Sequence, residues 1–548
     1  MAARTLTEGL EGQVARDPGA VAFVLESLEN PPLEVRRGPL REGALRMARG
    51  LVSLGLRRGG RVLLMLPTSV EFVELFFGTL DAGGTPVPAY PPVNARQLAD
   101  LGRSLEKFGR TSGTELAVLP GFLRDGLPVL EGVRVTTPEE IREAGKKPVA
   151  LPPPPGPDDL ALVQFSSGST GDPKGICLSH ANILSNILAF ADRLQQSSSD
   201  VCVTWLPLYH DMGLIGTLLA PILRGVPLAL LSPLDFLRRP VSWIRLLSKY
   251  RATIGVAPQF AYSLCARKVD PGELSDLDLS CVRVLLNGAE PIHPEGIDAF
   301  EEKLAPLGLR RGVVTPCYGL GEATLAVTMR APGSGAPSID VPVAEGTTMR
   351  VASVGPPVLG TEVRIRDERG NWLPEDRIGE ICVRGPSVCV GYLRGDRIEP
   401  ATDAEGWLPT GDLGLLHGGE LYVTGRKKDL VIVGGRNLYP QEIEAEAGKI
   451  AGVRPGRIVA FGIAEPRRDT EALVVVAEAV DDRRGEEIVG ELRRSLLAKF
   501  GVAPYDVLLV GKGEVPRTTS GKLRRSEARA MYLGGNFSHV LYRLRSAP

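Results

Sequence analysis

The chain carries almost no net charge and has no long apolar run, and these two absences exclude several classes of protein. Its 64 lysines and arginines nearly balance its 65 aspartates and glutamates, which leaves a net charge of -1. This balance does not favour binding to nucleic acid or to an anionic membrane. No apolar run reaches membrane-spanning length, and the N-terminal residues lack the apolar segment of a signal peptide. We therefore expect a cytoplasmic protein with no nucleic-acid partner and no stable insertion into a membrane.

Motifs for metal binding, disulfide formation and serine hydrolysis are also missing. The seven cysteines contain no Cys-x-x-Cys spacing and lie in apolar segments, so we expect buried free thiols. The five histidines contain no His-Glu-x-x-His zinc signature, and the chain has no Gly-x-Ser-x-Gly elbow. The sequence thus predicts no metal site built by the protein alone.

The 548 residues are too many for one compact core, and the sequence pattern changes along the chain. Up to about residue 320, helical periodicity alternates with apolar runs: residues 40–56 predict an amphipathic helix and residues 61–66 a buried strand. Such alternation is typical of βαβ units and a mostly parallel sheet. Residues 331–350 are rich in Gly, Pro, Ser and Thr and predict a loop or insertion, whereas residues 351–425 predict a small β subdomain. After Lys427 the pattern predicts a separate α+β domain.

The most informative segment is residues 165–175, which follow a predicted buried strand. It contains four hydroxyl side chains, three glycines and Lys174. Glycines let backbone N–H groups approach an anion, hydroxyls add donors, and a lysine supplies a point charge, so the segment suits nucleotide phosphates. It is not a Walker A loop, because Lys174 is followed by Gly175 rather than by Ser or Thr. A flexible surface loop is the alternative, since Gly/Ser/Thr clusters usually form loops.

Three later segments carry side chains that suit the rest of a nucleotide. Tyr318, which lies beside glycines, can stack on a base, and the carboxylate of Glu322 can hold Mg²⁺. Asp412, which we expect in a tight turn, can accept hydrogen bonds from both ribose hydroxyls. Lys522 follows a glycine on a loop near the end of the chain. Each segment alone is as well explained by a turn or by a solvated basic surface.

Together and in this order, the segments resemble the motifs of the adenylate-forming ligases over roughly residues 15–530. The resemblance implies an α/β fold whose large N-terminal domain, residues 1–426, contains two αβ sheets plus a small β barrel. A small, mobile α+β C-terminal domain, residues 427–548, would follow. It also implies that Mg-ATP activates a carboxylic acid to an acyl-adenylate, and that the acyl group usually passes to a thiol.

Within this superfamily the chain is most similar to the fatty-acyl-AMP ligases. The narrower resemblance lies in residues 86–92, 205–216, 236–240, 287–291 and 435–444. It implies a medium- or long-chain fatty acid as substrate and ATP and Mg²⁺ as cofactors. The acceptor would be the phosphopantetheine thiol of an acyl carrier protein or of a carrier domain in a polyketide or peptide synthase. A fatty-acid–CoA ligase and a catalytically inactive acyl- or nucleotide-binding homologue are the alternatives.

The resemblance also assigns roles to individual residues. The leaving pyrophosphate would be held by Ser166, Ser167, Gly168, Ser169, Thr170, Gly171 and Lys174. The adenosine would be held by Gly288, Ala289, Tyr318, Gly319, Asp412 and Arg426. Glu322 would bind Mg²⁺, Lys428 would be the hinge between the domains, and Lys522 would bridge the substrate carboxylate and the α-phosphate.

Three further expectations concern the acyl group. His210, at the start of an expected helix, would border the carboxylate end of the acyl tunnel, although a lone histidine is more often structural. The apolar stretch 253–260 would line the acyl pocket. Residues 329–352 would correspond to the insertion that, in fatty-acyl-AMP ligases, hinders the domain rotation needed for transfer to CoA.

Overall fold

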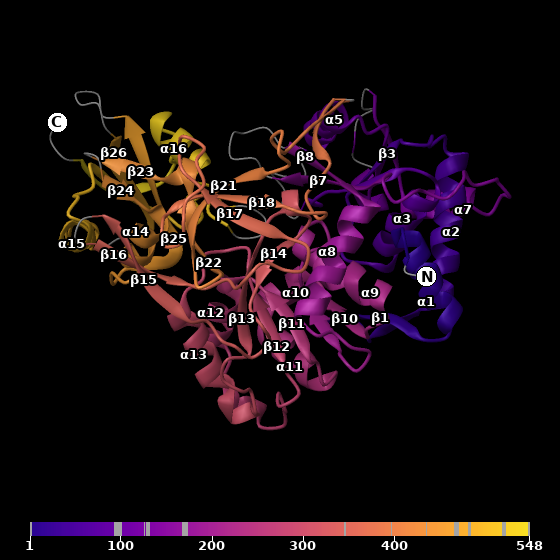
Figure 1. The fold of residues 1–548 in the computed structure, drawn as a ribbon, viewed down its shortest axis with the longest axis horizontal. Helices are drawn as coiled ribbons and strands as arrows, with labels where there is room; N and C mark the ends of the chain where they lie inside the picture. The colour runs from indigo at the N-terminus through magenta and orange to yellow at the C-terminus, as the bar shows by residue number, and fades with distance from the viewer. Residues whose placement is uncertain are drawn as a thin grey trace.

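The computed structural model describes residues 3–92, 101–124, 127, 132–166, 174–344, 347–395, 397–433, 436–464, 471–480, 484–517 and 522–545, a few of them by their backbone alone. The N-terminal helices, among them α1 (Leu6–Arg16), lie at one end of the molecule, and the C-terminal sheet lies at the other (Figure 1). Within the described ranges no helix combines the length and the apolar character needed to cross a bilayer.

An eight-stranded sheet organises the larger part of the chain. Its strand order is β14-β13-β12-β11-β9-β10-β1-β2, with parallel pairing throughout the middle and antiparallel pairing at both edges. The strands are β1 (Val21–Glu26), β2 (Leu33–Arg36), β9 (Cys202–Thr204), β10 (Leu228–Leu231), β11 (Ile254–Ala257), β12 (Val284–Asn287), β13 (Val314–Gly319) and β14 (Ala326–Met329). The short apolar runs of the central strands are buried on both faces, as parallel sheets require.

Helices pack around the sheets of this part, and the residues at the helix N-termini explain where some of them begin. In α3 (Val70–Asp81), the side chain of Ser69 accepts a hydrogen bond from the backbone N–H of Phe72 at 3.2 Å, which caps the helix N-terminus. The predicted helix over 40–56 is α2 (Arg37–Ser53), and it packs against α3. The other long helices of this part are α8 (His180–Arg193), α11 (Val241–Lys249), α12 (Gln259–Lys268) and α13 (Pro294–Leu304).

Two smaller sheets share a second core. One is parallel, in the order β4-β3-β5-β6, and consists of β3 (Arg61–Leu64), β4 (Thr85–Pro88), β5 (Leu116–Val118) and β6 (Arg134–Thr136). The other is antiparallel, in the order β20-β19-β8-β7, and consists of β7 (Leu160–Ser166), β8 (Lys174–Ser179), β19 (Gly391–Arg394) and β20 (Arg397–Glu399). Leu63, Val163 and Leu393 belong to one apolar cluster, so the two sheets pack together. Strand β19 thus extends the hairpin that flanks the hydroxyl-rich loop, although it comes from the predicted β subdomain.

A third antiparallel sheet, β17-β18-β21-β22, follows from residue 362 onward. Its strands are β17 (Glu362–Arg366), β18 (Gly379–Arg384), β21 (Leu408–His417) and β22 (Glu420–Arg426). The loop that the sequence predicts over 331–350 is instead largely a β-hairpin of β15 (Ser338–Ala344) and β16 (Thr347–Ala352). That expectation was wrong because Val341, Met349 and Val351 bury their side chains against β21 and β22, a tertiary contact that local composition does not reveal.

The C-terminal part has its own sheet, β25-β26-β27-β28, and its own apolar clusters on the two faces. The strands are β25 (Val453–Ala464), β26 (Glu471–Ala479), β27 (Asp506–Val510) and β28 (Val540–Arg545). The helices are α14 (Pro440–Ala447), α15 (Gly485–Phe500) and α16 (Arg525–Leu533), and a short hairpin joins β23 (Val431–Val433) to β24 (Arg436–Leu438). These elements agree with the α+β pattern that the sequence predicts after Lys427.

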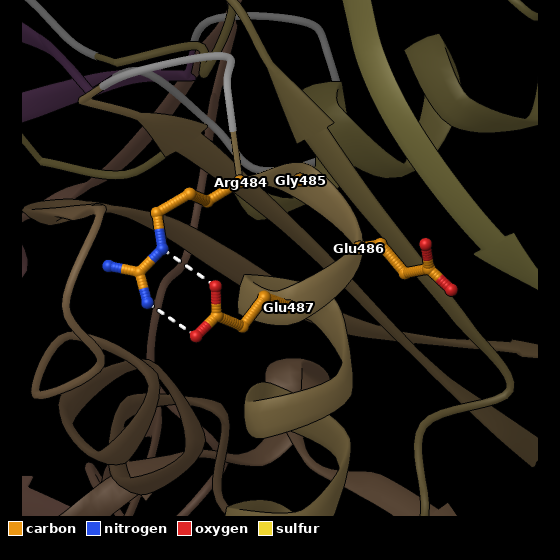
Figure 2. Close-up of a pocket in the computed structure, with 4 residues that line it drawn as sticks. All are labelled: Arg484, Gly485, Glu486 and Glu487. Carbon is orange, nitrogen blue, oxygen red and sulfur yellow. Dashed lines mark hydrogen bonds and ion pairs between the residues drawn. The ribbon is translucent and has the colours of Figure 1, made fainter.

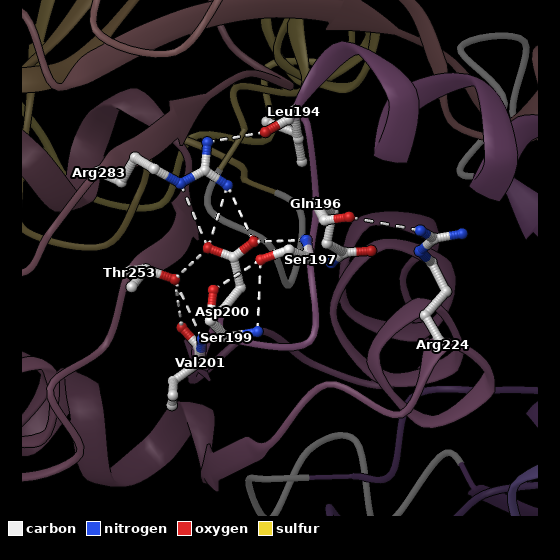
Figure 3. Close-up of polar contacts among 9 residues, drawn as sticks. All are labelled: Leu194, Gln196, Ser197, Ser199, Asp200, Val201, Arg224, Thr253 and Arg283. Carbon is white, nitrogen blue, oxygen red and sulfur yellow. Dashed lines mark hydrogen bonds and ion pairs between the residues drawn. The ribbon is translucent and has the colours of Figure 1, made fainter.

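Asp200 ties together the amino ends of three central strands (Figure 3). Its carboxylate accepts hydrogen bonds from the hydroxyl of Thr253 at 2.6 Å, from the backbone N–H of Ser197 at 2.8 Å and from the guanidinium of Arg283 at 3.1 Å. Burial disfavours the charge, but these bonds hold the pKa of Asp200 below its usual range. The network holds the start of β9 against the starts of β11 and β12. The residues that follow β9 lie at the opposite, carboxyl edge of the sheet.

Candidate active site

The carboxyl ends of the parallel strands bring several predicted residues to one edge of the large sheet. Gly288 and Ala289 follow β12, Tyr318 lies at the end of β13, and His210 and Asp211 follow β9. Neighbouring parallel strands end at the same edge, and ligands of open α/β sheets bind there. These positions span more than a hundred residues of sequence, from His210 to Tyr318, so their proximity comes from the topology.

The predicted adenine segment depends on a close approach of two strands. A Cβ atom on Gly288 would lie 2.9 Å from the sulfur of Cys317, so only glycine fits beside the residue that precedes Tyr318. Ala289 has a φ of 69°, a left-handed conformation that costs a non-glycine residue about 1 kcal/mol or more. Gly319 also has no space for a side chain, because a Cβ atom there would meet the carbonyl of Leu325 at 1.7 Å.

Tyr318, Asp412 and Arg426 form a hydrogen-bonded group at the end of β13. The phenol of Tyr318 donates to Asp412 Oδ2 at 2.7 Å, and Arg426 Nε lies 3.2 Å from Asp412 Oδ1. Burial raises the pKa of Asp412, while Arg426 and the Tyr318 hydroxyl oppose that shift. Asp412 does not lie in the tight turn that the sequence predicts; it lies within β21, opposite Arg426 of β22.

Glu322 and Lys174 lie on either side of Tyr392, a residue that the sequence patterns did not single out. Tyr392 Oη lies 3.2 Å from Glu322 Oε1, and Lys174 Nζ lies 5.0 Å from the centre of the Tyr392 ring. The three residues come from a short helical turn (Gly321–Ala323), from β8 and from β19. Because β19 is far along the chain from both partners, no local spacing could have indicated this contact.

Most of the hydroxyl-rich segment, residues 165–175, lies outside the described residues. Ser166 is described by its backbone, which pairs with Lys174 across the β7–β8 hairpin. Ser167, Gly168, Ser169, Thr170 and Gly171 lie outside the described residues. The described chain ends at Ser166 of β7 before these residues and begins again at Lys174 of β8.

Lys522, from the C-terminal part, lies among acidic groups of the N-terminal part. Burial lowers the pKa of Lys522, and Arg426 lowers it further, whereas Asp211, Glu290 and Asp412 raise it. The loop that carries Lys522 is closed by an antiparallel bridge between Arg517 and Leu523. The C-terminal lysine thus lies near the residues that follow β9 and β12 and near Asp412 of β21.

His210 and Asp211 form an ion pair through His210 Nδ1 and Asp211 Oδ1. Asp211 Oδ1 also accepts the backbone N–H of Met212 at 2.7 Å and so caps a π-helix over Met212–Leu219. Burial alone would raise the pKa of Asp211, but His210 and Lys522 outweigh burial and lower it. The helix that we expect after His210 is therefore present with wider, π-type turns, which often occur at functional sites.

The predicted hinge residue, Lys428, lies in a single 3₁₀ turn (Lys427–Asp429) between β22 and β23. Burial lowers the pKa of Lys428, and the neighbouring Arg426 adds to this shift. The next residue, Asp429, is bound to Arg525 of α16 at 2.9 Å. The first residue after Lys428 is therefore already attached to a C-terminal helix.

The donor set suits Mg²⁺ supplied with a nucleotide rather than a metal held by the protein alone. Among the residues that the structure describes, no three His, Cys, Asp or Glu side chains gather into a metal-binding group. Mg²⁺ is commonly bound by one or two carboxylates together with substrate phosphates and water, and Glu322 beside Lys174 fits that arrangement. A separate hollow at the start of α15 is lined by Arg484, Gly485, Glu486 and Glu487 (Figure 2), and none of these residues belongs to the site.

Known proteins share this architecture over nearly their whole length. The sequence pattern described as AMP-binding enzyme matches residues 10–393. The medium-chain-fatty-acid–[acyl-carrier-protein] ligase JamA of Moorena producens (strain JHB) is 34% identical over 524 residues, 87% of this chain and 86% of JamA. The long-chain-fatty-acid–AMP ligase FadD32 of Mycolicibacterium smegmatis (strain ATCC 700084 / mc(2)155) is 32% identical over 542 residues, 87% of this chain and 86% of FadD32. A solved structure from work on the fatty acyl-adenylate ligases of E. coli and L. pneumophila has a TM-score of 0.89 and 33% identity, and covers 97% of this chain and 98% of its own.

Proposed function

The chain belongs to the AMP-binding enzymes, and on that premise we propose that it converts a fatty acid and ATP to acyl-AMP and pyrophosphate and then passes the acyl group to a carrier-protein thiol. The similarity to JamA and FadD32, whose names state these activities, supports the proposal. We propose medium- and long-chain fatty acids as the substrate class and the cytoplasm as the location.

The position of Lys522 among Asp211, Glu290 and Asp412 is the observation that carries this proposal. A carboxylate must attack the α-phosphate of ATP, and the repulsion between the two anions opposes the attack. A cation held between them orients both groups and offsets that repulsion as the new C–O–P linkage forms and pyrophosphate leaves. Lys522 comes from the C-terminal part, so the domain arrangement of this structure is the one that suits adenylation.

The other site residues have complementary roles in the proposed reaction. Asp412, oriented by Tyr318 and Arg426, would accept the ribose hydroxyls, and the adenine would lie between Tyr318 and the Gly288–Ala289 segment. Lys174 and the hydroxyl-rich loop would hold the pyrophosphate. Glu322 would hold Mg²⁺, which supplies positive charge to the leaving group when bound.

We place the proposed acyl pocket beside the segments that follow strands β9 and β11. Phe260 packs edge-on against Trp205 with ring centres 5.9 Å apart, and Trp205 stacks on Phe236. Tyr90 and Tyr209 form a second edge-to-face pair at 5.0 Å. Aromatic and apolar side chains of this kind can line a pocket for an alkyl chain, and His210 would border its carboxylate end.

A carrier protein is the proposed acceptor because the β15–β16 hairpin contacts both parts of the chain. Val341 and Met349 of the hairpin share an apolar cluster with Tyr422 of β22 and with Tyr439, which precedes α14. A rotation of the C-terminal part for thiol transfer would separate Tyr439 from this cluster and expose apolar surface. This cost supports the proposal that residues 329–352 are the insertion that disfavours transfer to free CoA.

Product identification tests the proposal. The enzyme is incubated with ATP, Mg²⁺ and dodecanoic acid, with CoA in one sample and a phosphopantetheinylated carrier protein in another, and the products are measured by mass spectrometry. We expect acyl-AMP to persist with CoA and acylated carrier to form in the second sample. Rapid formation of acyl-CoA would establish a fatty-acid–CoA ligase, and the absence of acyl-AMP with retained ATP binding would establish an inactive homologue.

A further inference from the structure

Tyr392 touches the two charged groups at the phosphate end of the site. Its phenol oxygen lies 3.2 Å from Glu322 Oε1, and its ring centre lies 5.0 Å from Lys174 Nζ. The side chain is half-buried in β19, opposite Ile176 in the β8–β19 register. One aromatic side chain therefore contacts both a carboxylate and an ammonium group.

The backbone on both sides of this contact is fixed. The N–H of Cys389 donates to the carbonyl of Glu322 at 2.8 Å, and the N–H of Val390 donates to the carbonyl of Cys177 at 2.9 Å. These bonds attach the start of β19 both to the turn that carries Glu322 and to the strand that begins with Lys174. Tyr392 is thus held at a fixed place between its two partners.

The chemistry of the phenol matches both contacts. A carboxylate only accepts hydrogen bonds, so the Tyr392 hydroxyl is the donor to Glu322. A phenol is protonated at neutral pH, so the hydroxyl has the proton that it donates. The ring face carries negative electrostatic potential, which attracts the Lys174 ammonium group.

We propose that Tyr392 is a positioning residue: its hydroxyl aims the Glu322 carboxylate at Mg²⁺, and its ring holds Lys174 toward the terminal phosphates of ATP. The assignment rests on the proposed function. The Tyr392 hydroxyl contacts Oε1 of Glu322, whereas Oε2 of Glu322 forms no hydrogen bond within the described residues. Oε2 would therefore be the oxygen that binds Mg²⁺. Groups that orient a metal ligand in this way typically change metal affinity by about 10- to 100-fold when they are removed.

Two substitutions separate the two contacts. Tyr392→Phe keeps the ring and removes the hydroxyl, whereas Tyr392→Leu removes both. Tyr250→Phe is the matched control, because the Tyr250 phenol also donates to a carboxylate, that of Glu26, at a place remote from the site. Melting temperatures confirm that each variant is folded.

Binding is measured by calorimetry without any acid substrate, so that no turnover occurs. ATP is titrated into the enzyme in EDTA and at a series of Mg²⁺ concentrations. We expect Tyr392→Phe to bind ATP in EDTA as the wild type does, but to need about 10-fold more Mg²⁺ for half-maximal strengthening of ATP binding. We expect Tyr392→Leu to show the same Mg²⁺ defect and also to bind ATP several-fold more weakly in EDTA, because the cation–π contact is lost.

The outcomes distinguish this assignment from the proposed function. Wild-type binding of Mg-ATP with an unchanged Mg²⁺ requirement in Tyr392→Phe overturns the positioning role alone. If both substitutions weaken ATP binding in EDTA equally, the hydroxyl and the ring do not have the separate roles proposed for them. A wild-type protein that binds no Mg-ATP overturns the proposed function, and the role of Tyr392 with it.

Discussion

At the scale of single residues, Asp412 carries the proposed contact to the ribose. Its two carboxylate oxygens are held by different partners, Tyr318 on one side and Arg426 on the other. Asp412→Asn leaves one acceptor oxygen and removes the charge, so we predict an ATP dissociation constant about 10- to 100-fold higher, as expected for hydrogen bonds to a charged group. Calorimetric ATP titration checks this value. Asp376→Asn, which changes an exposed acid paired with His417, is the control, and equal ATP affinity of the two variants would refute the ribose role.

Buried His180 gives a prediction for the pH dependence of stability. Burial lowers the pKa of His180 to about 4, although Asp159 and Glu8 favour its charged form. Its Nδ1 accepts the backbone N–H of Leu6 at 3.1 Å, so protonation would break that bond. A histidine with a depressed pKa in the folded state contributes stability that is fully present above its unfolded value near 6.5 and is lost as the pH falls toward 4. The loss reaches about 3 kcal/mol below pH 4.

The prediction is measured as a difference between two proteins. His180→Asn keeps an acceptor for Leu6 but does not titrate. We expect wild-type stability, measured by denaturant unfolding, to fall more steeply than that of the variant between pH 6.5 and pH 4. Parallel curves for the two proteins over this range would show that His180 is not buried and neutral as described.

The site residues that the sequence predicts share one property. Tyr318, Asp412 and Lys522 lie in short segments whose composition, glycines beside an aromatic, acidic or basic side chain, matches their chemistry. Tyr392 could not be predicted in this way, because its partners Glu322 and Lys174 are far from it in the sequence and the fold alone brings the three together. The left-handed backbone of Ala289 could not be predicted either, since non-glycine residues rarely adopt it.

At the scale of elements, the ion-paired group around Arg525 holds the turn Lys427–Asp429 to the C-terminal part. Its guanidinium donates to Glu444 of α14 at 2.8 Å and to Asp429 at 2.9 Å, and all three side chains are largely buried. Arg525→Met leaves two buried carboxylates without their partner, so we predict destabilisation of the C-terminal part by about 3–5 kcal/mol. Thermal unfolding followed by calorimetry measures the loss. The neighbouring Arg524→Met is the control, because Arg524 is half exposed, and equal melting of the two variants would contradict the buried role.

A helix or a strand can be predicted from the sequence wherever buried side chains recur at the regular spacing of that element. The apolar run of β3 and the amphipathic helix α2 are predicted from local signals within a few residues. The β15–β16 hairpin and the π-helix over Met212–Leu219 are not. In the hairpin, Pro342 and the neighbouring polar residues interrupt the alternation of apolar and polar side chains that would predict a strand. The apolar side chains of the hairpin pack on β22, and the local sequence does not indicate this contact. In the π-helix, nearly every residue is buried, so no helical period marks the face or the turn type.

At the scale of the whole molecule, the proposed reaction requires that Lys522 be present for adenylation and move away for thiol transfer. We propose the turn Lys427–Asp429 as the place for that motion, because Asp429 is bound to Arg525 of the C-terminal part. Lys428→Pro fixes φ at the hinge, so we predict that it retains adenylation but transfers the acyl group from supplied acyl-AMP to the carrier at least 10-fold more slowly. Lys428→Ala, which removes the charge but leaves φ free, is the control. Normal transfer by Lys428→Pro would place the hinge elsewhere.

Acid-dependent exchange of labelled pyrophosphate into ATP tests the central claim most directly, because it requires only the first half-reaction. We predict exchange by the wild type with dodecanoic acid, similar exchange by Lys512→Ala, whose lysine is exposed, and a loss of about 10²- to 10³-fold in Lys522→Ala. Transfer from supplied acyl-AMP should remain largely intact in Lys522→Ala. Exchange by Lys522→Ala at the wild-type rate would contradict the account, because the convergence of Lys522 with Asp211 and Asp412 would then have no part in adenylation.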